Sequence, residues 1–85
     1  MKVFIISDNT HTLTGMRLSG IEGVVVHERE EILKELAKVK KKRDIGIILI
    51  TELLAERVKL ELDEIKLSSS LPIIKVRPGS EGFKL

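Results

Sequence analysis

The stretch from Ile45 to Thr51, which reads IGIILIT, decides the fold of this 85-residue chain. Successive side chains of a β-strand point to opposite faces of the sheet. Two apolar sets are therefore expected, with Ile45, Ile47 and Leu49 on one face and Ile48 and Ile50 on the other. A strand that is apolar on both faces is typical of a parallel sheet covered by helices. The stretch indicates an α/β protein.

The segments on either side of this strand alternate between β-rich and helical patterns. Three further strands are predicted at Lys2–Ser7, Gly23–Val26 and Ile73–Val76, and helices at Thr10–Leu18, Arg29–Lys41 and Leu53–Leu67. Right-handed crossovers favour a four-stranded parallel sheet of order 2-1-3-4. The sequence thus predicts one small doubly wound (Rossmann/flavodoxin-like) domain over residues 1–85, with three helices and a flexible tail at 77–85.

This layout leaves one face of the sheet short of cover. The first helix is short and is expected alone on its face, whereas the other two helices share the opposite face. Ile74 and Val76 are expected to share one face of the last strand, with Ile73 opposite. Leaving half of three such side chains in water costs about 2–4 kcal/mol. Either a further C-terminal helix after Leu85 or a partner is then needed to cover this face. We expect a partner, and self-association when the chain is isolated.

Composition excludes several classes of protein. The chain has no cysteine, which excludes disulfides and thiolate chemistry. It has no apolar run of the roughly 20 residues that cross a bilayer, so we expect a cytoplasmic protein without direct membrane insertion. Charged residues make up 33%, mostly Lys, Glu and Arg, as in heat-adapted proteins.

The basic run Lys38–Arg43 falls at the end of a predicted helix, where cations complement the helix dipole. Net charge is only +2, and Tyr and Trp are absent, so nucleic acid is not an expected partner. A phosphate-binding patch is the alternative interpretation of the run. Nucleic-acid binding there would require a salt-sensitive affinity.

Asp8 follows the first strand, where α/β proteins often place working residues. A phosphoacceptor receiver domain would also need an Asp at the end of the third strand, where this chain has Thr51. Gly15, Gly20 and Gly23 do not lie in the turn before the first helix, which does not fit a phosphate-binding loop. His11 and His27 have no metal-ligand spacing. We expect no catalytic residue, metal or cofactor.

The polar residues after the first and third strands are expected mainly to cap helices. Asp8, Asn9 or Thr10 can accept hydrogen bonds from free amides of the next helix, and Thr51 can do the same before Glu52. The same edge is the topological switch point of the sheet and could meet a partner. The candidate partner-binding residues are Asp8, Asn9, Ile47, Leu49, Thr51, Glu52 and Arg77.

Three stretches resemble the F subunit of the V-type (archaeal/vacuolar) ATP synthase. Gly15–Glu22 is similar to its GFRLAGIE segment, Ile50–Glu56 to its ITE..AE motif, and Leu71–Gly79 to its LP.ii.iPg ending. The motif positions that correspond are Gly15, Arg17, Leu18, Gly20, Ile21, Thr51, Glu52 and Pro72. Met16 stands where the family often has Phe. Family members usually continue into a C-terminal helix after the fourth strand.

The resemblance implies a non-catalytic component of a rotor stalk. Such a protein binds the coiled-coil D subunit, turns within the catalytic A/B hexamer, and supports ATP-coupled transport of protons or sodium. It is peripheral to the membrane and brings no active site of its own. The alternative from the residues alone is a degenerate receiver-like or small-ligand-binding regulatory domain that uses a crevice formed by Asp8, Asn9, Thr51 and Arg77.

Overall fold

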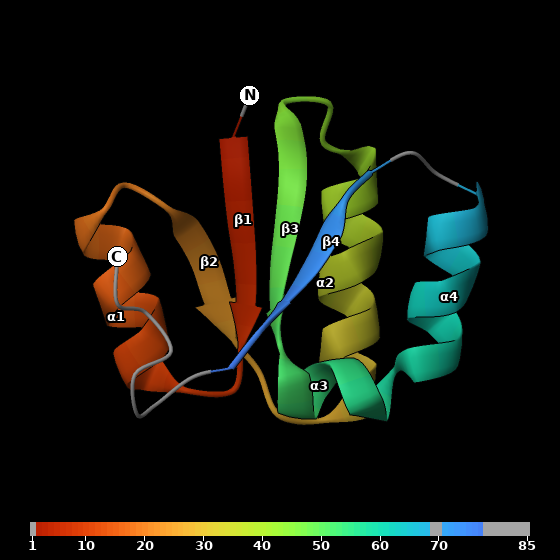
Figure 1. The fold of residues 1–85 in the computed structure, drawn as a ribbon, viewed down its shortest axis with the longest axis horizontal. Coiled ribbons are helices and arrows are strands. Elements are labelled where there is room, and N and C mark those ends of the chain that lie inside the picture. Colours follow the sequence, from red (N-terminus) through yellow and green to blue (C-terminus); the bar gives the residue numbers. More distant parts are fainter. Residues whose placement is uncertain (1, 69–70, 78–85) are drawn as a thin grey trace.

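The computed structural model describes residues 2–68 and 71–77 of the chain. Its elements follow in the order β1 (Lys2–Ser7), α1 (Thr10–Leu18), β2 (Glu22–Val25), α2 (Arg29–Lys41), β3 (Ile45–Thr51), α3 (Glu52–Arg57), α4 (Lys59–Ser68) and β4 (Ile73–Val76). The strands form one parallel sheet of order β2-β1-β3-β4 (Figure 1). The predicted fold class and strand order are confirmed. Apart from Arg77, the tail predicted at 77–85 lies outside the described residues.

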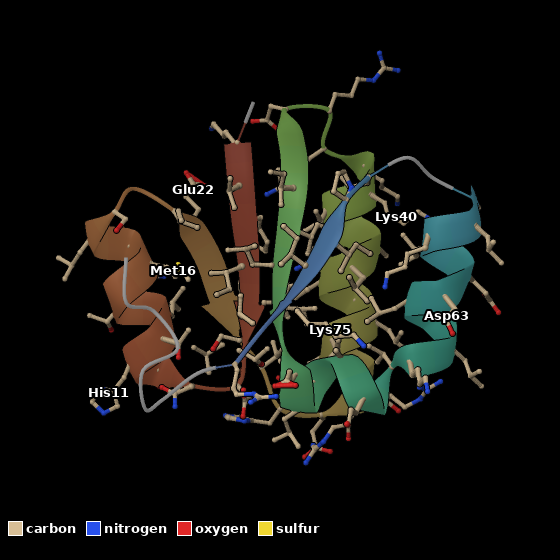
Figure 2. All side chains as sticks on the ribbon, viewed as in Figure 1. His11, Met16, Glu22, Lys40, Asp63 and Lys75 are labelled. Carbon is tan, nitrogen blue, oxygen red and sulfur yellow. The ribbon has the colours of Figure 1, made fainter. Side chains whose placement is uncertain are left out.

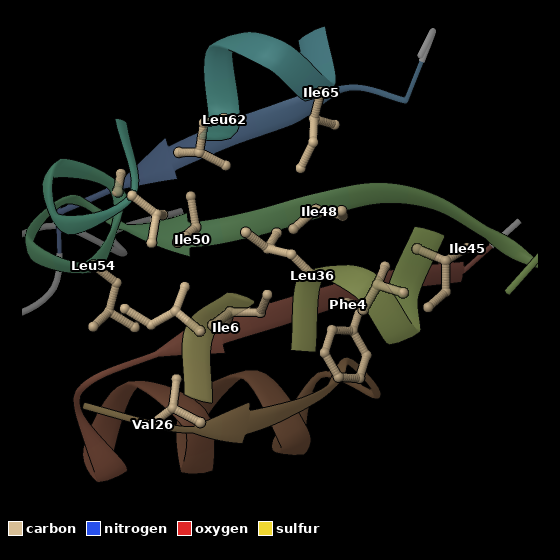
Figure 3. Close-up of a cluster of buried hydrophobic side chains, with 14 residues drawn as sticks. Phe4, Ile6, Val26, Leu36, Ile45, Ile48, Ile50, Leu54, Leu62 and Ile65 are labelled. Atoms are coloured by element: carbon tan, nitrogen blue, oxygen red, sulfur yellow. The ribbon is translucent and has the colours of Figure 1, made fainter. Parts of the chain in front are cut away.

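The main hydrophobic core fills the space between the sheet and the helices α2, α3 and α4 (Figure 3). Ile32, Leu36 and Val39 recur at helical spacing along α2, and all three are buried. The strands contribute Phe4, Ile6, Ile45, Ile48 and Ile50. The helices α3 and α4 contribute Leu54, Ala55, Leu62 and Ile65, and Val58 between them is also in the core. One face of the sheet is therefore well packed.

Among the described residues, the opposite face is covered where α1 lies, over β1 and β2. Leu13 of α1 is buried there, and Ile5 of β1 has no exposed surface. Gly23 of β2 pairs with Ile5, and a Cβ at Gly23 would clash with the Ile5 carbonyl oxygen. The absence of a side chain at Gly23 therefore permits this close approach between the strands.

The alternation predicted for β3 is wrong at its first residue. Lys2 pairs with Ile45, but the next residue, Val3, pairs with Ile47, so Gly46 is an extra residue in β3. A bulge of this kind shifts the side-chain alternation by one position. Ile45 consequently joins Ile48 in the core cluster instead of sharing the face of Ile47.

The helix predicted over Leu53–Leu67 is interrupted at Val58, whose φ of −125° and ψ of 32° are not helical. The Arg57 carbonyl, which an unbroken helix would use internally, instead accepts a hydrogen bond from Arg29 Nη1 at 3.2 Å. Arg57 Nη1 in turn donates to the His27 carbonyl at 2.8 Å. These two hydrogen bonds therefore join the junction of α3 and α4 to the start of α2, and Val58 is buried.

Candidate functional site

A polar network joins the carboxyl ends of β1 and β3. The Thr51 hydroxyl donates to Asp8 Oδ1 at 2.6 Å, and the Asp8 backbone N–H donates to Thr51 Oγ1 at 3.3 Å. The Asn9 backbone N–H donates to the Ser7 hydroxyl at 2.9 Å, and that hydroxyl donates to the Asn9 carbonyl at 3.0 Å. Thr51 and Ser7 are fully buried. The network therefore fixes the point where the two strands turn into helices.

The capping predictions are confirmed for one residue and corrected for another. Asn9 is the N-cap of α1, and its Oδ1 accepts from the Thr12 N–H at 3.1 Å. Thr51 occupies the N-cap position of α3, but its side chain makes no capping hydrogen bond. Its hydroxyl is directed to Asp8 instead, because the adjacent strand end brings that carboxylate within 2.6 Å.

Glu52 and Arg77 form a second pair at the same edge of the sheet. Arg77 Nε donates to Glu52 Oε2 at 2.7 Å, and Arg77 Nη2 lies 3.5 Å from Glu52 Oε1. This hydrogen bond and the charge of Arg77 lower the pKa of the Glu52 carboxyl from its ordinary value. The Arg77 side chain is exposed and the Glu52 side chain is partly exposed, so the pair presents a charged rim to solvent.

These contacts leave few free polar groups for a ligand in the crevice predicted from Asp8, Asn9, Thr51 and Arg77. Asp8 and Thr51 bond each other, Asn9 caps a helix, and Arg77 pairs with Glu52. A small ligand would have to replace contacts that the chain already makes. Within residues 2–68 and 71–77, no group of His, Asp or Glu side chains could hold a metal ion. His11 points away from the sheet on the outer side of α1 (Figure 2).

An apolar surface lies beside this edge, on the face of β3 and β4 that α1 does not reach. It consists of Ile47, Leu49, Ile74 and Val76, and we call it the open face. Ile47, Leu49 and Val76 are half-buried, and 48% of the surface of Ile74 is exposed. No described helix lies in front of β4 in the view of Figure 1.

Solvent exposure on this face increases from β1 to β4, as one row of paired residues shows. Ile5 of β1 pairs with Leu49 of β3, and Leu49 pairs with Ile74 of β4. Exposure rises along the row, from none at Ile5 to half-buried at Leu49 and 48% at Ile74. On the packed face, the paired Ile6 and Ile50 are both fully buried. The predicted shortage of cover on one face is thus present within the described residues.

The candidate partner-binding residues divide between these two neighbouring regions. Asp8, Asn9, Thr51, Glu52 and Arg77 lie at the carboxyl edge, and Ile47 and Leu49 lie on the open face. The candidate set lacked Ile74 and Val76. The alternation of side chains along β4 already indicated that Ile74 and Val76 share one face. In the sheet, Ile74 pairs with Leu49 and Val76 pairs with Thr51.

The described residues include no helix long and apolar enough to span a membrane. They define a small α/β domain with a parallel sheet, a structural polar network at its carboxyl edge and an incompletely covered apolar face.

Comparison with known proteins specifies the class. Residues 3–84 match the family model described as ATP synthase (F/14-kDa) subunit. The chain is 37% identical over 90 residues to the A-type ATP synthase F subunit of Thermococcus kodakarensis, covering 100% of this chain and 81% of the relative. It is 38% identical over 87 residues to the corresponding F subunit of Pyrococcus abyssi, covering 96% and 79%. The chain belongs to the F-subunit family of A/V-type ATP synthases.

A solved structure shares the fold. The crystal structure of the V-type ATP synthase F subunit of Archaeoglobus fulgidus superimposes with a TM-score of 0.72. The match covers 88% of this chain and 95% of that chain, at 21% sequence identity. The similarity extends the agreement from sequence motifs to the arrangement of strands and helices.

Proposed function

We propose that this chain is a non-catalytic central-stalk subunit of an A/V-type ATP synthase. It binds the coiled-coil D subunit of the stalk, turns with it inside the catalytic A/B hexamer, and so supports ATP-coupled transport of protons or sodium. It acts in the cytoplasm, peripheral to the membrane, and has no active site of its own. The observation that carries the proposal is the open face, because a parallel sheet normally has both faces covered.

The open face suits a helical partner. Its apolar residues are flanked at the carboxyl edge by Glu52 and Arg77, which supply a charged rim. An apolar centre with a polar rim is the usual composition of a protein interface. Burying the remaining exposed surface of Ile47, Leu49 and Ile74 contributes about 2–4 kcal/mol at roughly 25 cal per Å². Tight binding therefore needs the rim as well as the apolar centre.

Co-purification with the coiled-coil subunit of the same complex tests the proposal. The unchanged chain should be retained by a tagged coiled coil, and Ile74→Glu should lose most of this retention because it places a charge in the interface. Leu67→Glu is the matched control, since Leu67 is 89% exposed on α4 and away from the open face. Failure of the folded, unchanged chain to bind would contradict the proposal and favour the regulatory-domain alternative.

A further inference from the structure

A hollow lined by cations lies at the amino edge of the sheet, at the opposite end of the strands from Asp8 and Thr51. The described residues that line it are Lys40, Lys42, Arg43, Ile45, Gly46, Leu71 and Pro72. We call it the basic hollow. It joins the end of α2 and the start of β3 to the segment before β4, so residues far apart in sequence form it. Lys40 lies near this end of α2 in Figure 2.

The cations of the basic hollow are not neutralised by the described part of the chain. Lys38 pairs with Glu35 and Lys2 pairs with Asp44, but Lys40, Lys42 and Arg43 form no ion pair within residues 2–68 and 71–77. No carboxylate is among the described residues that line the hollow. The concentration of one sign of charge around a concave surface favours an anionic ligand.

Complementing the α2 dipole does not account for all of these charges. Lys38, Lys40 and Lys41 lie in the last turn of α2, whereas Lys42 and Arg43 follow its end. The Lys42 ammonium lies 5.5 Å from the centre of the Phe4 ring, a cation–π contact. Phe4 lines a neighbouring hollow together with Glu22, Asp44 and Lys42, so Lys42 is shared between the two hollows.

The surface between the cations is apolar. Ile45 is buried, Leu71 is half-buried and packs against the core, and Pro72 is exposed. A bare phosphate has no apolar group to place there, and the absence of Tyr and Trp from the chain leaves no stacking platform for nucleic-acid bases apart from Phe. A peptide that carries carboxylates around an apolar side chain matches both features.

We propose that the basic hollow binds an acidic segment of a partner protein, with its carboxylates on Lys40 and Arg43 and an apolar side chain against Leu71 and Pro72. This surface lies at the amino edge and is separate from the open face. The chain therefore carries a second contact, and loss of either one leaves the other intact.

NMR titration of the isotope-labelled 85-residue chain with the acidic peptide EELEELEE tests this inference. Amide shifts are expected at Lys40, Arg43, Gly46 and Leu71. Lys40→Glu combined with Arg43→Glu should weaken binding at least about tenfold, because charge reversal turns attraction into repulsion. Lys34→Glu combined with Lys66→Glu changes net charge equally at positions outside the hollow, and should weaken binding less than about threefold.

Three results would overturn the inference. The first is the absence of these shifts in the folded chain, and the second is an equal loss of affinity in both double variants. The third is tighter binding of heparin or phosphatidylserine vesicles than of the peptide at the same residues, which would indicate a general polyanion or lipid surface. Retention by the coiled-coil subunit is measured separately, so failure here is distinguishable from failure of the stalk proposal.

Discussion

At the scale of single residues, Gly23 and Gly15 have different structural requirements although both occur in or near the motif that resembles the V-type ATP synthase family. Gly23 lies in β2 so close to the Ile5 backbone that a Cβ there would overlap the Ile5 carbonyl oxygen. A backbone oxygen cannot rotate away as a flexible side chain can. A Cβ at Gly15 of α1 would have no neighbour within 4 Å. The two glycines therefore provide a matched test of packing.

Gly23→Ala should lower the free energy of unfolding by about 1–3 kcal/mol, because the added methyl group forces β1 and β2 apart. Gly15→Ala should raise it by about 0.5–1 kcal/mol, because alanine is favoured over glycine inside a helix. Urea unfolding followed by circular dichroism measures both changes. Equal effects of the two substitutions would contradict the close approach at Gly23.

The hydrogen bonds between Asp8 and Thr51 join β1 to β3 directly. Thr51→Val preserves the shape of the buried side chain but leaves the Asp8 N–H and a carboxylate oxygen without this partner. The expected loss of unfolding free energy is about 1–3 kcal/mol. In a double-mutant cycle with Asp8→Ala, the coupling energy should be about 0.5–1.5 kcal/mol. Additive effects would show that the two side chains act independently.

At the scale of elements, the start of α2 is held by two carboxylates. Glu31 Oε1 accepts from the Glu28 N–H at 3.1 Å and from the His27 N–H at 3.3 Å. These hydrogen bonds lower the pKa of the Glu31 carboxyl. The hydrogen bond and ion pair with Arg29 lower the pKa of the Glu61 carboxyl. The ionised forms of both carboxyl groups are therefore more stable in the folded than in the unfolded chain.

The ionised Glu31 and Glu61 side chains contribute to the free energy of unfolding. This contribution is fully present above the ordinary carboxyl pKa of 4.5 and is lost as the pH falls below it. The melting temperature should therefore fall between about pH 5 and pH 3. Glu31→Gln combined with Glu61→Gln should reduce this fall, because neither amide titrates. Glu64→Gln is the control, since the Glu64 side chain has no ion pair within the described residues. An unchanged pH profile in the double variant would contradict this role.

The elements also show how far the sequence predicts the fold. Alternating β and helical patterns predicted the α/β class and the sheet order, because each element buries an apolar stripe that its own period reveals. The break at Val58 escaped prediction because Leu54, Leu62 and Ile65 keep an apolar period across it. At the break the Arg57 carbonyl accepts a hydrogen bond from Arg29, a contact between residues 28 positions apart that no local pattern reveals.

The same reasoning explains the partial prediction of the candidate site. The apolar alternation of β3 identified Ile47 and Leu49, but the bulge at Gly46 moved Ile45 to the packed face. A bulge is a property of the pairing between two strands and has no clear period in one of them. Asp8 and Thr51 were identified by position, although only the paired strand ends reveal that they bond each other.

At the scale of the whole molecule, we expect the open face to cause association of the isolated chain. Ile74 is 48% exposed beside half-buried Leu49. The isolated chain should bind a hydrophobic dye and self-associate at high concentration, and Ile74→Glu should reduce both. The substitution should change unfolding free energy by no more than about 0.5 kcal/mol, because the site is at the surface. Dye fluorescence and analytical ultracentrifugation measure these effects, and a monomeric chain that binds no dye would contradict them.

The stalk proposal requires the coiled coil to cover the open-face residues Ile47, Leu49 and Ile74. Methyl NMR spectra of the labelled chain, recorded during titration with the coiled-coil stalk subunit, test this most directly. We predict the largest shifts at the methyl groups of those three residues, with smaller shifts at the buried Ile48. Binding that shifts the methyl resonances of Leu18 or Leu67 and leaves those of the open face unchanged would contradict the account.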